Sequence, residues 1–421
     1  MAKANAADLA AARKRIGPIQ RREMRLAFAM LFPTFAAVML VVLVPLAANF
    51  WISVKPVELA DLRAAVPNVR ERVSGDIAAP GDILTVSYRV RPNPPGAEVQ
   101  GVALIDTLPP GLVLQSGDDR CRVDGTALRC EIGTLAPRER LDVELTFAAG
   151  QAYLDAGSPS PRDSDVATEG AGRNVLASFE FTLDNFRRVF DTSEFWTVLW
   201  VSMVYTVGGT AGALVLGLFA AQLMMTAFPG RAFMRGLFLF PYVSPVIAVA
   251  FTWIFLLDPF SGTVNAILTS TGVTNEAINF LGQRGVALAT VIAFEAWRYF
   301  PLAFLFILAR MQSLSADLNE AAEMDGATPF QKFWYISLPQ LVGILSTLFL
   351  LRFIWTFNKF DDIFLLTGGA SGTRTFTVNV YEQAFALSDL GAGAAVAVVI
   401  FFLLAIFVAL YFRFVPKEEG M

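Results

Sequence analysis

The sequence predicts an all-α bundle of six membrane-spanning helices, with an all-β domain inserted between the first helix and the second. The 421 residues are 55% hydrophobic and only 17% charged, and so low a charged fraction is typical of membrane proteins. Six apolar runs are each long enough to cross a bilayer, whereas residues 55–180 contain no such run. Polar and apolar residues alternate there instead, which predicts β-strands.

The first span follows a basic N-terminal segment. Residues 1–25 carry an excess of Lys and Arg, and residues 26–54 form an apolar run that spans a bilayer at about 1.5 Å per residue. A secretory signal also begins with a basic flank, but its apolar part usually has about 7–15 residues. We therefore expect a retained first helix, with residues 1–25 in the cytoplasm by the positive-inside rule.

Residues 55–180 form the predicted extracytoplasmic insertion. Residues 81–90 and 140–147 alternate as half-buried strands do. Residues 151–175 are rich in Gly, Ser, Pro and Asp, which predicts a flexible tether.

The only two cysteines lie in this insertion. If Asp124–Ala127 is a four-residue turn, Cys121 lies opposite Cys130 on a hairpin, within reach of a disulfide. Two reduced, partly buried thiols are the alternative; we favour the disulfide because such bonds persist outside the cytoplasm. The cysteine segment, with the flanking residues 106–112 and 133–137, resembles the immunoglobulin-like repeat of bacterial surface proteins. That resemblance covers residues 73–148 and implies a β-sandwich.

The chain returns to the membrane through residues 181–190, where Leu183, Phe186, Val189 and Phe190 share a helical face suited to the interface. We expect five more spans in the remainder, residues 181–421, at 195–225, 233–257, 286–310, 340–362 and 391–413. The loops alternate in basic charge, which places both termini in the cytoplasm and the β-domain outside the cell or in the periplasm.

A polar loop, residues 315–339, separates the fourth and fifth spans. Ser315 is placed to cap a short helix, Gly326 to end it, and Thr328-Pro329 to begin a second one, while Pro339 opens the next apolar segment. One face of the first short helix carries Leu318, Ala321, Ala322 and Asp325, which form a shallow surface for a partner.

This loop resembles the coupling loop of permease subunits of bacterial ABC importers. The matching residues are Glu320, Ala321, Ala322, Gly326, Ile336, Leu338 and Pro339. The adjoining residues 325–334 resemble the sugar-importer branch, which includes maltose and α-glucoside permeases. The resemblance implies that the ATPase subunits dock on Glu320, Ala321, Ala322, Asp325 and Gly326.

Charged residues also occur within the apolar spans. Glu295, Arg298 and Arg352 lie inside spans, and Lys359, Asp361 and Asp362 lie near the end of the fifth. Each costs about 3 kcal/mol there unless it is paired or faces water. Glu295 and Arg298 are spaced to meet on one helix face, either as an ion pair that fixes helix packing or in a functional role.

Residues 297–301 and 355–360, together with 365–369, resemble the segments that line the sugar in maltose-type permeases. The resemblance implies a substrate site formed by Arg298, Tyr299, Leu302, Arg352, Trp355, Thr356 and Lys359. The basic residues at 298, 352 and 359 replace smaller or neutral ones. That departure leaves open a related oligosaccharide or a substrate with an anionic group.

Other function classes find little support. The chain has no histidine and no Gly-x-x-x-x-Gly-Lys-[Ser/Thr] motif, so we expect no catalytic residue, no metal site and no cofactor in it. ATP and magnesium would bind to separate subunits. No basic domain suggests nucleic-acid binding.

The sequence thus predicts a permease subunit of an ATP-driven sugar importer in the bacterial inner membrane, moving an α-linked oligosaccharide such as an α-glucoside, maltose or trehalose. Its expected partners are membrane lipid, a second permease subunit, a dimer of ATP-binding subunits, and a periplasmic or lipid-anchored sugar-binding protein. The alternatives are a permease for a glycerol-phosphate-type solute, an ATP-independent secondary transporter, and a membrane-anchored surface protein.

Overall fold

The computed structural model describes residues 18–414 apart from 64, 173–174, 177–178 and 192–193. The chain divides into two units, residues 1–52 and 53–421. The first contains α2 (Pro18–Val38), a π-helical turn (Met39–Leu43) and most of α3 (Val44–Ser53). Together these make a helix, Arg22–Ser53, long and apolar enough to span a membrane, as predicted for residues 26–54. Most of the predicted cytoplasmic segment, residues 1–17, lies outside the described residues.

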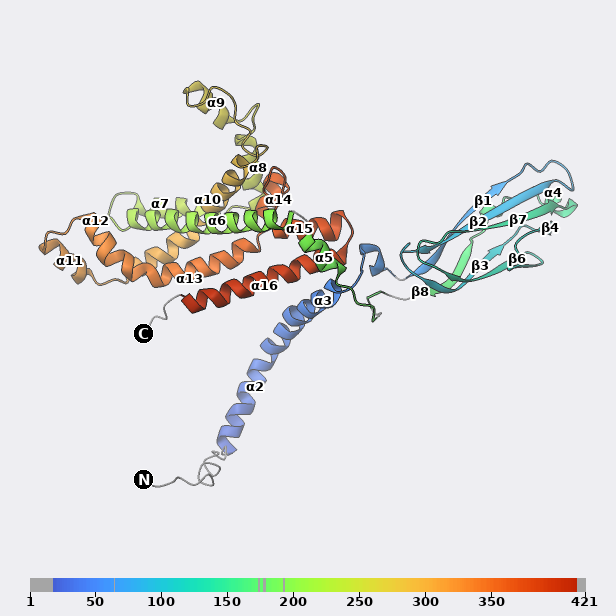
Figure 1. Cartoon of the computed structure of the whole chain (residues 1–421), viewed down its shortest axis with the longest axis horizontal. Helices are drawn as coiled ribbons and strands as arrows, with labels where there is room; N and C mark the ends of the chain where they lie inside the picture. Colours follow the sequence, from blue (N-terminus) through green and yellow to red (C-terminus); the bar gives the residue numbers. More distant parts are fainter. Residues whose placement is uncertain (1–17, 64, 173–174, 177–178, 192–193, 415–421) are drawn as a thin grey trace. The chain divides into compact units, whose positions relative to one another are not determined.

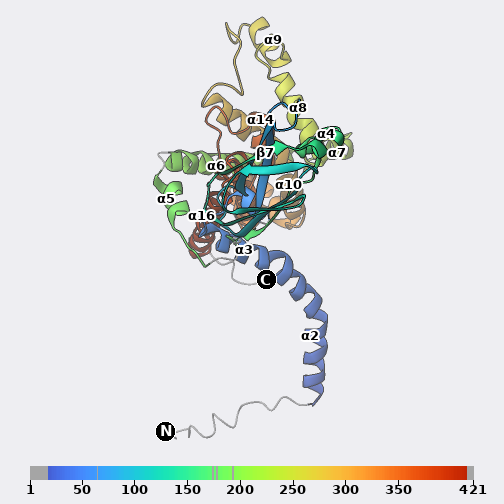
Figure 2. The same ribbon diagram turned by 90° about the vertical axis from the view of Figure 1, so that its right-hand side faces the viewer.

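The second unit begins with two four-stranded antiparallel sheets, ordered β1-β2-β7-β4 and β5-β6-β3-β8 (Figures 1 and 2). Their inward residues, among them Val86, Leu104 and Phe147, form one common core. The strands are β1 (Val66–Ser74), β2 (Ile83–Asn93), β3 (Val99–Thr107), β4 (Leu112–Ser116), β5 (Cys121–Asp124), β6 (Ala127–Leu135), β7 (Leu141–Ala149) and β8 (Ala167–Gly172). We call residues 66–172 the β-domain.

The β-domain is larger than the predicted residues 73–148, and the predicted tether at 151–175 is wrong for most of its length. That segment contains α4 (Gln151–Asp155) and β8, and β8 pairs with β3. Its glycines permit close packing: a Cβ on Gly172 would lie 2.2 Å from the Ala65 Cβ. A composition typical of linkers therefore belongs here to a tightly packed strand.

Cys121 and Cys130 face each other on the hairpin of β5 and β6 and form a disulfide. The turn between the strands consists of Gly125 and Thr126, with Gly125 in the left-handed region at φ 63°. The disulfide joins the two strands next to the core, since Cys130 is fully buried.

After the β-domain, the described residues form twelve α-helices and two π-helical turns. They are α5 (Asp184–Asp191), α6 (Glu194–Leu223), α7 (Arg231–Val243), α8 (Val246–Leu256), α9 (Thr263–Ser270), α10 (Val286–Gln312), α11 (Ala316–Met324), α12 (Pro329–Lys332), a π-helical turn (Phe333–Ser337), α13 (Leu338–Phe357), α14 (Asp361–Thr367), α15 (Phe376–Tyr381), a second π-helical turn (Glu382–Ala386) and α16 (Leu390–Phe414).

The short helix α5 holds the segment that follows the first span. The Asn185 side chain donates hydrogen bonds to the carbonyls of Ser53 (2.9 Å) and Lys55 (2.8 Å). Of the predicted interfacial face, Phe186 and Val189 pack against the helical core, whereas Leu183 and Phe190 are exposed.

Five helices of the described chain are long and apolar enough to span a membrane, or six if α7 and α8 count as one span. The span predicted at residues 233–257 is not a straight helix, because α7 and α8, which cover it, meet at an angle of 93°. Pro245 explains the break: it lacks an amide hydrogen and forces Ser244 into an extended conformation, at φ −66° and ψ 143°. Figures 1 and 2 show α8 and α9 directed away from α6, α7 and α10.

Small residues bring α6 and α10 into close contact. A Cβ added to Gly212 would lie 2.8 Å from the Ala296 Cβ, and one added to Gly217 would lie 2.7 Å from the Ala303 Cβ. These glycines let the two backbones approach more closely than larger side chains would allow.

Stability of the β-domain is expected to depend on pH through Glu71. This residue of β1 points inward, and its Oε1 atom is buried without a hydrogen-bond partner. Burial, reinforced by the charge of Asp106, raises the pKa of Glu71 from its ordinary 4.5 to about 7. The raised pKa means that the folded state binds this proton more tightly, so the contribution of Glu71 to stability is complete below pH 4.5 and is lost as the pH rises through about 7.

Hydrogen exchange in the full chain would test this dependence. We expect protection of β1 and β2 to be lower at pH 8 than at pH 5.5, after correction for the intrinsic rate. Glu71→Gln should abolish most of the difference. Glu144→Gln, an exposed carboxylate on β7, is the matched control. Equal pH dependence in both variants would contradict the assignment.

Candidate functional site

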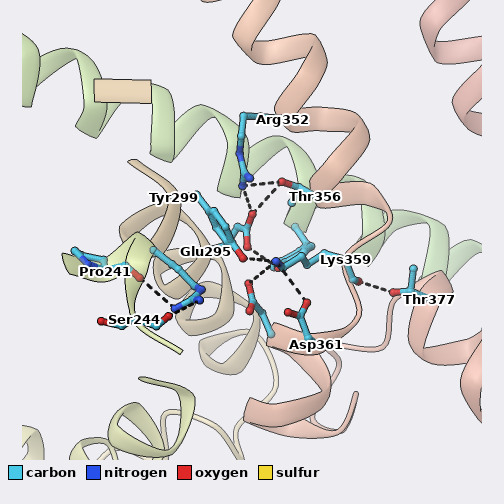
Figure 3. Close-up of polar contacts among 12 residues, drawn as sticks. Pro241, Ser244, Glu295, Tyr299, Arg352, Thr356, Lys359, Asp361 and Thr377 are labelled. Atoms are coloured by element: carbon cyan, nitrogen blue, oxygen red, sulfur yellow. Dashed lines mark hydrogen bonds and ion pairs between the residues drawn. The ribbon is translucent and has the colours of Figure 1, made fainter. Parts of the chain in front are cut away.

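A cluster of polar side chains is buried between α6, α10, α13 and α14. Figure 3 shows Glu295 and Tyr299 of α10, Arg352 and Thr356 of α13, and Lys359 of the following segment pointing towards one another. Neighbouring apolar residues form two hydrophobic cores close to it. We call these residues the polar cluster: Tyr205, Glu295, Tyr299, Arg352, Thr356, Lys359 and Asp362.

Glu295 of α10 lies at the centre of the polar cluster and is completely buried. It forms an ion pair with Arg352 and accepts hydrogen bonds from the Thr356 hydroxyl (2.9 Å) and the Tyr205 hydroxyl (3.1 Å). Arg352 and Thr356 are four residues apart on α13, so both side chains reach the same carboxylate oxygen. The predicted partner, Arg298, is therefore wrong: Glu295 pairs with a different helix.

The space for Glu295 comes from α6. A Cβ added to Gly209 would lie 2.6 Å from the Glu295 Cγ atom, closer than real contacts occur. Any larger residue there would push the carboxylate away from its partners.

Arg298 instead holds the break between α7 and α8. Its guanidinium donates hydrogen bonds to the carbonyls of Pro241 (3.1 Å) and Ser244 (2.9 Å), which end α7 (Figure 3). A cation at a helix C-terminus also interacts favourably with the helix dipole. The arginine predicted to contact the substrate is thus engaged in positioning a bent helix.

Tyr299 brings together the cations of the site. The centroid of its ring lies 4.2 Å from the Arg352 Cζ, 4.4 Å from the Lys359 Nζ and 5.6 Å from the Arg298 Cζ. Lys359 also donates a hydrogen bond to the Tyr299 hydroxyl. Each cation above a ring face adds about 0.5–2 kcal/mol, depending on how far it is removed from water.

Several buried polar atoms at the site lack hydrogen-bond partners among the described residues. They are both carboxylate oxygens of Asp362 and the Nε atoms of Arg298 and Arg352. Lys359 approaches Asp362 at 3.7 Å and Asp361 at 3.5 Å, which is within ion-pair range but long for a hydrogen bond. Since an unsatisfied buried polar group costs about 1–3 kcal/mol, these atoms are suited to binding a hydroxyl-rich ligand or water.

The other two predicted substrate residues, Trp355 and Leu302, lie outside the polar cluster. Trp355 is 48% exposed although Arg352 and Thr356 on the same helix are buried, and Leu302 is half-buried. Sequence reasoning missed Tyr205 and the Gly209 contact. The only available signal was that a tyrosine precedes a glycine-rich stretch of an apolar helix.

The loop between α10 and α13 has the local geometry predicted for it. The Ser315 hydroxyl accepts from the Asp317 amide at 3.3 Å, Gly326 has φ 76°, and Thr328 forms a capping box with Gln331. An ion pair between Glu323 and Lys332 joins the two short helices. These contacts fix the turn.

The surface of this loop is open and partly apolar. Ala321 is exposed and Ala322 half-buried, while Met324 and Phe330 are 89% and 72% exposed. We call Leu318, Ala321, Ala322, Met324 and Phe330 the loop surface. Pro339 lies in the first turn of α13, where the apolar segment opens as predicted, and α13 continues the preceding turns into one 29-residue helix from Pro329 to Phe357.

Comparison with known proteins identifies the family of this chain. Residues 213–419 match the family described as "Binding-protein-dependent transport system inner membrane component". The inner membrane ABC transporter permease protein YcjO of Escherichia coli K12 is 35% identical over 232 residues, which cover 55% of this chain and 78% of that protein. The chain belongs to this family. The predicted resemblance to permease subunits of bacterial sugar ABC importers is thereby confirmed.

Two further similarities concern this permease. The trehalose/maltose transport system permease protein MalF of Thermococcus litoralis is 32% identical, over 55% of this chain and 78% of that protein. The solved structure of a bacterial ABC transporter that imports the acidic polysaccharide alginate matches the fold with a TM-score of 0.50 at 20% identity, over 57% of this chain and 87% of that one. The β-domain lies outside the family match.

The family is the transmembrane permease component of such transporters and not their ATPase. Among the described residues, no group of three or more Cys, Asp or Glu side chains is arranged to hold a metal ion.

We expect that removing one partner of the Glu295–Arg352 ion pair destabilises the permease more than removing both partners. Removing one partner leaves a buried charge, at a cost of about 3–5 kcal/mol, whereas removing both avoids that cost. Arg352→Gln should therefore lower the detergent unfolding temperature more than the double variant Glu295→Gln/Arg352→Gln. Tyr205→Phe, which loses one neutral hydrogen bond, should have a small effect. Additive losses in the double variant would contradict this coupling.

Proposed function

We propose that this permease moves an α-linked oligosaccharide, such as an α-glucoside, maltose or trehalose, into the cell by ATP-driven alternating access. The loop surface supports the ATP-driven part of this proposal. It is a partly apolar patch on two short helices, each with a capped N-terminus, and it is suited to docking by a separate ATPase subunit. The named substrates of the Thermococcus litoralis relative support the choice of sugar.

A continuous helix offers a mechanical path from the ATPase to the polar cluster. The loop surface leads into Pro329–Phe357, and this one helix also carries Arg352 and Thr356. Both side chains bind Glu295 on α10, so a displacement at the loop would be transmitted to two helices at once. Closure of an ATPase dimer around ATP would supply the displacement.

The charges of the polar cluster favour a neutral substrate. Glu295 neutralises Arg352, and Asp361 and Asp362 flank Lys359. Arg298 is occupied by two carbonyl groups. The unpartnered atoms of Asp362 and Arg352 suit hydroxyl groups, and the Tyr299 ring suits the CH face of a sugar. A glycerol-phosphate-type solute is the alternative, and it would need one of these ion pairs to open.

The proposed assembly places the chain in the bacterial inner membrane with six spans and both termini in the cytoplasm, counting α7 and α8 as one span. The β-domain then lies outside the membrane. A second permease subunit completes the pore, two ATP-binding subunits dock on the cytoplasmic side, and a periplasmic or lipid-anchored binding protein delivers sugar. ATP and magnesium belong to the ATPase subunits.

Coupling is tested by changing the loop surface in the assembled transporter. Ala321→Arg should lower ATP-driven uptake at least about tenfold, because a bulky charge replaces a methyl group at the docking surface. Gln312→Arg, at the exposed end of α10, is the matched control. Uptake that survives Ala321→Arg with unchanged ATPase co-purification would overturn the coupling role.

Substrate choice is tested in the reconstituted complex with a panel of sugars and sn-glycerol 3-phosphate, measuring stimulation of ATPase activity. We expect an α-linked oligosaccharide to stimulate most. Tyr299→Leu should raise its KM about three- to tenfold through loss of the aromatic ring that faces the sugar, with assembly unchanged. Stimulation by the phosphate ester alone would favour the alternative, and an unchanged KM would remove Tyr299 from the site.

A further inference from the structure

The β-domain has a basic pocket that the transport function does not explain. The pocket has a volume of 250 Å³ and is lined by Arg91, Pro92, Pro95, Arg138, Glu139 and Arg140. Arg91 comes from the end of β2, and the other two arginines come from the loop between β6 and β7. Three arginines from two segments thus line one pocket together with two prolines.

The charge pattern of the β2–β7 pair changes at this pocket. Arg89 lies opposite Asp142, and the two form an ion pair at 2.7 Å. The paired register ends one position further on, at Val90 and Leu141, and Arg91 and Arg140 are the next residues of the two segments. Like charges at neighbouring cross-strand positions destabilise a sheet. Two arginines therefore follow the Arg89–Asp142 ion pair, just beyond the end of the paired register.

The pocket's arginines form no ion pair with any carboxylate in the described part of the chain. Asp142 is within electrostatic range of Arg140 but is bound to Arg89. The carboxylate of Glu139 accepts a hydrogen bond from the Ala136 amide at 2.7 Å, inside its own turn. The pocket keeps an excess of positive charge.

The backbone of the loop holds Arg138 in an unusual conformation. Its φ is 62°, in the left-handed region that favours glycine, and its amide donates a hydrogen bond to the Pro95 carbonyl. An arginine where glycine would fit more easily, facing a pocket with two other arginines, indicates that its side chain is needed there.

We propose that this pocket binds an oxyanion, namely a phosphate or carboxylate group carried by a small molecule or by a lipid headgroup. Guanidinium groups bind such anions through paired, charge-assisted hydrogen bonds, and three of them offer more donors than one anion needs. The bound anion relieves the repulsion between Arg91 and Arg140. The inference does not depend on which sugar is transported, and its test does not measure transport.

Protection of arginines from phenylglyoxal, quantified for each residue by mass spectrometry, tests the site in the full chain. The protein is placed in phosphatidylcholine nanodiscs at constant ionic strength, with chloride replaced by inorganic phosphate. We expect phosphate to slow modification of Arg91, Arg138 and Arg140 about tenfold. Arg70 and Arg122, exposed on the same domain, should react at unchanged rates.

Lipid composition distinguishes the two sources of the anion. Protection in phosphatidylglycerol nanodiscs without added phosphate identifies a headgroup as the ligand. Protection by soluble phosphate alone identifies a small molecule. Equal reactivity of pocket and control arginines under both conditions overturns the proposal.

Arg138→Gly separates binding from folding, because glycine suits the backbone at this position and the exposed arginine side chain, with its guanidinium, is removed. Phosphate should then protect Arg91 and Arg140 about tenfold less, with hydrogen exchange of β2 and β7 unchanged. Arg70→Gln, the matched control, should leave protection intact. Full protection in Arg138→Gly would show that the anion does not bind in this pocket.

Discussion

One carboxylate organises the helical part of this permease. Glu295 is fully buried and receives a guanidinium and two hydroxyl groups from two other helices. A carboxylate without such partners would be very costly in a nonpolar interior, so α6, α10 and α13 can adopt few other relative positions. Apolar packing in a membrane discriminates weakly between helix arrangements, whereas this ion pair is specific in distance and direction.

The same interaction depends on a very small neighbour. Gly209 leaves room for the Glu295 side chain, and Gly212 and Gly217 continue the close contact between α6 and α10. Polar specificity and small-residue packing therefore act together: the glycines bring the helices close, and the ion pair fixes their register. Neither feature would suffice alone, because close packing without the charge pair leaves register free to vary.

The sequence predicted local features better than distant pairings. The caps at Ser315 and Thr328 and the turn at Gly326 depend on neighbouring residues alone, and the structure has all three. By contrast, Glu295 and Arg298 are close in sequence, and their spacing suggested a pair that does not form. Arg352 is 57 residues away, so only the tertiary arrangement reveals it as the partner. The prediction of a flexible tether at the glycine-rich strand β8 was wrong for a related reason. Amino-acid composition does not reveal that these small residues are required for close packing.

The bend between α7 and α8 makes two distant residues interdependent. Pro245 has no amide hydrogen to donate to the Pro241 carbonyl near the end of α7, and Arg298 donates instead to that carbonyl and to the Ser244 carbonyl at the bend. If the proline were lost, a regular helix could form and the guanidinium would have no acceptors; if the arginine were lost, the bare carbonyls would face a nonpolar environment. In related permeases, these two positions should accordingly be inherited or replaced together, although 53 residues separate them along the chain.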